Sequence, residues 1–232
     1  KYPSLLQFDK DQQKETPTKQ NLKTLYKIEQ IPSDTYMRER LDEVEPRYLQ
    51  KTLDRLVAQL QRGKVLEQYR YLDEYCLVSL DATGFFSSHE VHCESCCVKN
   101  HKDGTVTYYH QMLAAVLMNP NYPTVFPLML EPIVKQDGKT KNDCEHNAAK
   151  RLLRNLGNSH PHLKMIIVLD GLYADGVIIK LLKELKMPFI ITAQSDDLKY
   201  LFEFYNTAKK TEVTETTQFQ ETVYRYTNNL PL

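Results

Sequence analysis

The feature that most constrains the fold is a change in hydrophobic period at Tyr75. Before this residue, apolar side chains recur at helical spacing, whereas after it short continuous apolar runs alternate with amphipathic segments. Strands joined by short loops pair antiparallel, and strands joined through a helix become parallel neighbours. The sequence therefore predicts an α/β (mixed α+β) fold in which helices flank a mixed sheet. The predicted strands are 75–80, 106–118, 125–133, 165–169 and 189–192, and the predicted helices follow 143 and span 177–185 and 195–208.

Four zones follow from this pattern. Residues 1–18 are polar and are expected to form a mobile lead. Residues 19–74 are expected to form a helical N-terminal region in which prolines separate three helices. Residues 75–210 hold the sheet and its helices. Residues 211–232 are rich in threonine, with a loose alternation of apolar side chains that predicts the first strands of a β-rich segment.

Composition narrows the class of protein. Equal numbers of basic and acidic side chains, 30 of each, give a formal net charge of zero, so any contact with nucleic acid must come from local patches. No apolar run approaches the roughly 18 residues that span a bilayer, and no secretory signal is visible. Five cysteines, three of them within 93–97, do not resemble a secreted disulfide framework. These features predict a soluble cytoplasmic protein with reduced thiols.

Two aspartates share one local design. Asp81 and Asp170 each follow a continuous apolar run directly, and each precedes a turn of small residues. A carboxylate at the end of a buried strand loses hydration unless it is paired or binds a cation. If the two strands are parallel neighbours, both carboxylates meet at one edge of the sheet, which is a typical position for Mg²⁺ or Mn²⁺. Either aspartate alone could simply cap a turn, but the matched pair predicts a metal site.

A second group of candidate ligands lies between the first and second predicted strands. Cys93 and Cys96 have the spacing of a zinc knuckle, in which both thiolates face one tetrahedral site. His89 or His92, together with His101, are the expected imidazole ligands of a structural Zn²⁺. Because no second C-x2-C motif accompanies them, the alternative is a hairpin tip with reduced thiols and exposed histidines. The whole cluster falls within thirteen residues and comprises His89, His92, Cys93, Cys96, Cys97 and His101.

Several segments resemble the DDE transposases of bacterial insertion sequences. They are Cys76–Gly84, Gly104–Gln111, Gln136–Glu145 with Ala148–Leu152, and Val168–Gly171, and the similarity extends from about residue 20 to 232. The resemblance implies a ribonuclease-H-like core with a β-rich insertion before the last of three acids. It also implies Mg²⁺- or Mn²⁺-dependent cleavage and strand transfer during DNA transposition, with Asp81 and Asp170 as the first two acids. Transposon ends and target DNA are the implied partners, and a nucleoid-associated homodimer on DNA is expected.

The third acid is expected to lie beyond this chain. In these relatives it follows the insertion in a Y-x2-R-x3-E-x6-K context, which Tyr224 and Arg225 do not match. The chain is therefore interpreted as a fragment that lacks the third carboxylate. The rival is Glu203, which lies 33 positions after Asp170 on a predicted helix. Its apolar neighbours on that helix favour an ordinary surface glutamate.

Two other functions stay open on the sequence alone. One is a catalytically inactive, zinc-bearing module that binds nucleic acid, and the other is a ribonuclease-H-like nuclease. The presence of both aspartates favours an enzyme. The helical region 19–74 and the β-rich pattern of 211–232 favour a transposase over a simple nuclease.

Overall fold

The computed structural model describes residues 2–72, 74–133, 145–196, 198–210, 215–219 and 222–226. The chain divides into two compact units, 1–52 and 53–232. Within the residues that the structure describes, no helix combines the length and the apolar character needed to cross a membrane.

The first unit is helical. It contains α1 (Leu5–Gln12), α2 (Pro17–Leu25), α3 (Asp34–Asp42) and the beginning of α4 (Pro46–Arg62). Ser4, Thr16 and Ser33 each cap a helix by accepting a hydrogen bond from the backbone N–H three residues later. The three predicted helices of the N-terminal region are therefore confirmed. Helix α1 and the start of α2, however, occupy the segment that was expected to be a lead without regular structure.

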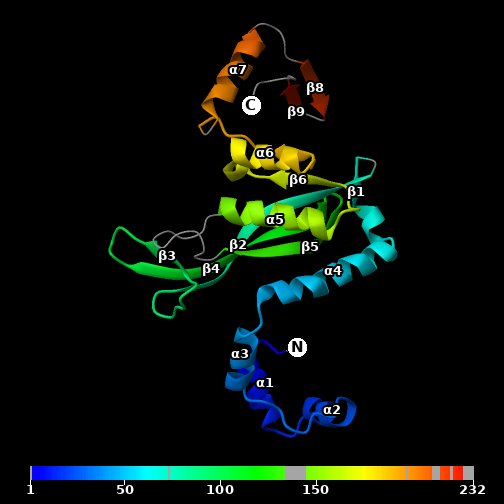
Figure 1. Cartoon of the computed structure of the whole chain (residues 1–232), viewed down its shortest axis with the longest axis vertical. Coiled ribbons are helices and arrows are strands. Elements are labelled where there is room, and N and C mark those ends of the chain that lie inside the picture. The colour runs from blue at the N-terminus through cyan, green and yellow to red at the C-terminus, as the bar shows by residue number, and fades with distance from the viewer. Residues whose placement is uncertain are drawn as a thin grey trace. The chain divides into compact units, whose positions relative to one another are not determined.

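The second unit is built on a mixed sheet (Figure 1). Its main path is β3-β4-β2-β6-β7, with β1 beside β2 and β5 beside β4. Strand β4 runs antiparallel to both of its neighbours, β2 and β5, whereas β6 and β7 run parallel to β2. The predicted fold class, a mixed sheet flanked by helices, is confirmed. The strands are β1 (Arg70–Tyr71), β2 (Tyr75–Ser88), β3 (Cys97–Asn100), β4 (Val106–Asn119), β5 (Tyr122–Ile133), β6 (Met165–Leu169) and β7 (Phe189–Ile191).

Helices supply the crossovers that the parallel strands require. Helix α5 (Glu145–Ser159) connects β5 to β6, and α6 (Gly176–Glu184) connects β6 to β7. Helix α5 packs on β4 and β5 and also touches α6 (Figure 1). Its apolar face is fully buried and comprises Ala148, Ala149, Leu152, Leu153 and Leu156. The predicted capping residue of this helix, Asp143, lies outside the described residues. Short 3₁₀ helices, Val65–Tyr69 and Gly171–Tyr173, precede β1 and follow β6.

Three details differ from the sequence prediction. Strand β2 does not end at Asp81 but continues to Ser88, because β4 pairs with it along nearly its whole length. The short strand β3 was not predicted, and its four residues pair with the start of β4. Helix α7 begins at Lys199, later than the predicted start at 195, and ends at Lys210. After it, β8 (Glu215–Phe219) and β9 (Thr222–Tyr226) form a separate antiparallel hairpin.

Candidate functional site

Asp81 lies within β2, and Asp170 directly follows β6, the parallel neighbour of β2. The four pairs that join β2 to β6 run from Cys76 with Met165 to Ser79 with Val168, and each pair differs by 89 positions. Asp81 and Asp170 differ by the same 89 positions, so the register continued by two residues sets one opposite the other. Strand β6 ends directly before Asp170, whereas β2 continues past Asp81 to Ser88. This register supports the expected convergence of the two carboxylates, which stays a prediction.

Each aspartate also has a local hydrogen bond. One oxygen of Asp81 accepts the backbone N–H of Ala82 at 2.8 Å. One oxygen of Asp170 accepts the backbone N–H of Leu172 at 3.0 Å and caps the 3₁₀ helix that follows β6. Both residues are exposed. A carboxylate has about four lone-pair positions, so these single bonds leave most of its capacity for a cation.

A third carboxylate, Glu145, belongs to the same region. It is the first residue of α5, it is half-buried, and its Oε2 accepts a hydrogen bond of 3.3 Å from the hydroxyl of Tyr173, whose side chain is only 1% exposed. Burial is the largest cause that raises the pKa of Glu145, the Tyr173 hydrogen bond opposes it, and the charges of Asp170 and Asp81 raise it further. Asp170 and Asp81 thus lie close enough to Glu145 for their charges to act on its carboxyl group.

The raised pKa of Glu145 gives a pH-dependent prediction. A carboxyl whose pKa is raised in the folded state contributes most to stability below its ordinary value of 4.5, and that contribution is lost as the pH rises through the folded-state pKa. Without metal ions, Glu145→Gln is therefore expected to be more stable than the wild type at neutral pH, with the advantage disappearing below about pH 4.5. Urea unfolding of both proteins between pH 4 and pH 7 measures this. An advantage that does not change with pH would contradict the electrostatic cause.

Sequence reasoning missed Glu145 as a site residue. No local pattern marks it, because its position depends on how α5 approaches the edge of the sheet. The signal that could have found it is topological: it begins the helix that leads into the strand before Asp170. The rival third acid, Glu203, is exposed on α7. Asp81 and Asp170 are among the charges that raise the pKa of Glu145, whereas Glu203 is not.

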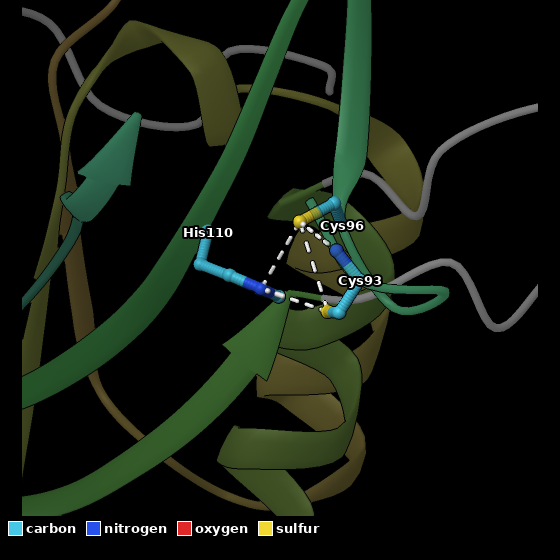
Figure 2. Close-up of side chains that lie close together, drawn as sticks. All are labelled: Cys93, Cys96 and His110. Atoms are coloured by element: carbon cyan, nitrogen blue, oxygen red, sulfur yellow. Dashed lines mark hydrogen bonds between the residues drawn. The ribbon is translucent and has the colours of Figure 1, made fainter. Parts of the chain in front are cut away.

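A second cluster lies away from these acids. Cys93 and Cys96 meet His110 of β4, and Figure 2 shows the imidazole pointing toward both sulfurs. The His110 Nε2 lies 3.3 Å from the Cys93 Sγ and 3.2 Å from the Cys96 Sγ, and the two sulfurs are 3.7 Å apart. The three ligand atoms all lie within 4.8 Å of one another, which is close enough to hold one metal ion. Among the described residues, no other group of three or more His, Cys, Asp or Glu side chains does so. It could bind an ion such as zinc.

The imidazole partner differs from the prediction. The Nε2 of His101 lies 2.8 Å from the hydroxyl of Thr107, and the ring of His92 stacks on Tyr108. The Nδ1 of His89 is 2.9 Å from the backbone carbonyl of Val106. The third thiol of the sequence cluster, Cys97, is buried and directs its Sγ to the carbonyl of Ile133. Cys93 and Cys96 therefore lie together as predicted, but the histidine beside them is His110 of β4.

No protein-family model and no curated protein matches this chain. A function for it is therefore proposed from the arrangement of its side chains.

Proposed function

We propose that this chain is a metal-dependent enzyme that cleaves and joins DNA, as a DDE transposase does. The single observation that carries the proposal is the matched register of Asp81 in β2 and Asp170 directly after β6, the parallel neighbour of β2. The order of the sheet also supports it: three antiparallel strands are followed by two crossover-linked parallel strands, as in the ribonuclease-H-like core that the resemblance implies. Transposon ends and target DNA, bound by a homodimer, are part of the same proposal.

Mg²⁺ or Mn²⁺ is the proposed cofactor, although the three acids are not a group whose ligand atoms all lie within 4.8 Å of one another. Both are hard cations that prefer carboxylate oxygens, and Asp81, Asp170 and Glu145 supply three carboxylates. Across the described ranges, none of the three forms an ion pair with lysine or arginine. Burial first, and then the charges of Asp170 and Asp81, raise the pKa of Glu145, and a bound dication would offset the cost of ionising it. When bound, such ions polarise a phosphodiester and stabilise the leaving oxygen.

The residues of the chain have separate roles in this proposal. Asp81 and Asp170 hold cations, and their backbone hydrogen bonds fix the orientation of each carboxylate. Glu145 is the third ligand that a two-ion site needs, and the Tyr173 hydroxyl holds it in place. Glu203 is the competing third acid that the sequence prediction allows. A third acid within the described residues would make the chain competent to cleave DNA without a carboxylate from elsewhere.

The test is nicking of a supercoiled plasmid by the purified protein. We expect nicks with 3′-hydroxyl ends in Mg²⁺ or Mn²⁺ and none in EDTA. Glu145→Gln is expected to lower the rate at least about 100-fold, because the ligands of such a unit act together, whereas Glu203→Gln is expected to keep the wild-type rate. The reverse ranking would make Glu203 the third acid. Absence of nicking by a folded protein in both ions would contradict the proposed function.

A further inference from the structure

The thiol–imidazole cluster has the dimensions of a tetrahedral zinc site. With Zn–S bonds of about 2.3 Å and Zn–N bonds of about 2.0–2.1 Å, two sulfur ligands lie about 3.8 Å apart and a sulfur and a nitrogen about 3.6 Å apart. The two sulfurs here are 3.7 Å apart, and the nitrogen lies 3.2 and 3.3 Å from them. A shift of a few tenths of an ångström in the imidazole therefore completes three corners of the tetrahedron.

The backbone around the cysteines has the form of a metal-binding turn. The N–H of Cys96 donates to the carbonyl of Cys93 at 3.2 Å, which closes the turn. The N–H of Cys93 donates to the Sγ of Cys96 at 3.3 Å. The turn thus directs both sulfurs to one point before any ion arrives.

The histidine is held in place from a distant part of the sequence. His110 pairs with Phe86 across the β2–β4 ladder, directly beside a bulge in β2 at Phe85. Its ring stacks on Phe85, with centroids 5.8 Å apart and planes 12° apart, and it also contacts Phe86 at 5.7 Å. These aromatic contacts restrict the orientation of the imidazole. The third ligand is therefore preorganised by the sheet, independently of the turn that carries the cysteines.

Neither a disulfide nor a simple hydrogen bond fits the cluster as well as a shared ion does. A disulfide requires sulfurs about 2.05 Å apart, whereas these thiols are free and separated by 3.7 Å. A thiol hydrogen bond to the imidazole accounts for one sulfur–nitrogen contact, but one nitrogen with two equivalent sulfur neighbours is the arrangement of a shared ion. Cys96 is 2% exposed and Cys93 is exposed, so one side of the cluster is closed and the other is open to water.

We propose that Cys93, Cys96 and His110 bind one Zn²⁺, with water in the fourth position. Two thiolates and an imidazole select zinc over Mg²⁺ or Ca²⁺. The ion links the turn at 93–96 to β4 and so stabilises the distal end of the β2–β4 ladder. This proposal does not depend on the acids at the other site, and the cluster could bind zinc whether or not the protein cleaves DNA.

The test is zinc content and affinity of the purified full chain. We expect one zinc per chain by elemental analysis after dialysis, and a thiolate-to-cobalt charge-transfer band when Co²⁺ replaces it. Removing a residue that only hydrogen-bonds to a metal ligand lowers metal affinity about 10–100-fold. His110→Ala removes a ligand itself, so it is expected to lower the zinc affinity more than about 100-fold. Cys93→Ser is expected to remove the contribution of its sulfur to the charge-transfer band.

Matched variants separate the site from its neighbours. His101→Ala and Cys97→Ser remove the same residue types close by in sequence and are expected to keep the zinc and the cobalt spectrum. Circular dichroism establishes that each variant is folded. The proposal is overturned if the folded wild type takes up no zinc or cobalt, if Cys93 and Cys96 are recovered as a disulfide under native conditions, or if His101→Ala loses the metal while His110→Ala keeps it.

Discussion

Asp170→Asn is expected to lower the rate of metal-dependent DNA nicking at least about 1,000-fold while leaving the fold intact. Asparagine keeps the size of the side chain and its ability to cap the 3₁₀ helix by accepting the Leu172 N–H. It removes the negative charge that a dication needs. Because Asp81 occupies the matching position on β2, Asp81→Asn is expected to have a loss of similar size, and the double variant is expected to be little worse than either single one.

Two measurements make this prediction specific. Mn²⁺ binding, followed by paramagnetic resonance, is expected to weaken together with the nicking rate. Asp175→Asn is the matched control, because Asp175 also caps a helix just after β6, accepting the N–H groups of Val177 and Ile178. It is expected to bind Mn²⁺ and nick DNA as the wild type does. Full nicking by Asp170→Asn, or equal losses in Asp175→Asn, would remove the metal site from the proposed function.

Leu153→Ala is expected to reduce the free energy of unfolding by about 2–5 kcal/mol. Leu153 lies on the inner face of α5, is 0% exposed, and belongs to the core that α5 forms with the sheet. The substitution removes apolar contacts and leaves a cavity that a close-packed interior fills only in part. The substitution is also expected to disturb the position of Glu145, because Glu145 is the first residue of α5.

The matched control is Leu56→Ala. Leu56 also lies in a helix, α4, but is 57% exposed, so little buried area is lost. Alanine is also the better helix former, and the expected change is within about 0.5 kcal/mol. Urea unfolding followed by circular dichroism compares the two variants. A loss below about 1 kcal/mol for Leu153→Ala would contradict the packing of α5 on the sheet.

Most of the fold could be predicted from the sequence because most elements have a local signature. The run at Met165–Leu169 has the same bounds in the sequence prediction and in the structure, since five continuous apolar residues bounded by polar ones define a buried strand. The predicted end of β2 was wrong for the opposite reason. Its outer half mixes polar, small and aromatic residues, none of them buried, and it is a strand because β4 pairs with it, which no local pattern of β2 records.

The residues of the two sites also differ in whether a local sequence pattern marks them. The two aspartates and the two cysteines could be predicted, because each pair has a local signature: an acid after an apolar run, or a C-x2-C turn. His110 and Glu145 could not be. His110 lies 14 positions after Cys96 and reaches it because β4 folds back beside β3, where the pairing of Cys97 with Tyr109 continues to Cys96 and His110. The nearer histidines were expected instead, and the strand pairing places His101 against Thr107.

The alternation of β4 has a consequence for how the two sites relate. His110 and Ala114 are four positions apart on one strand, so they share a face of the sheet, and Ala114 is the cross-strand partner of Asp81. His110 of the thiol cluster and Asp81 therefore lie on one face of the sheet, about 13 Å apart along β4 at roughly 3.3 Å per residue. The cross-strand pair of Met112 and Thr83 lies between them on this face. If the protein binds DNA as we propose, a strand along this face would span the distance with about four nucleotides, at a rise of about 3.4 Å per nucleotide.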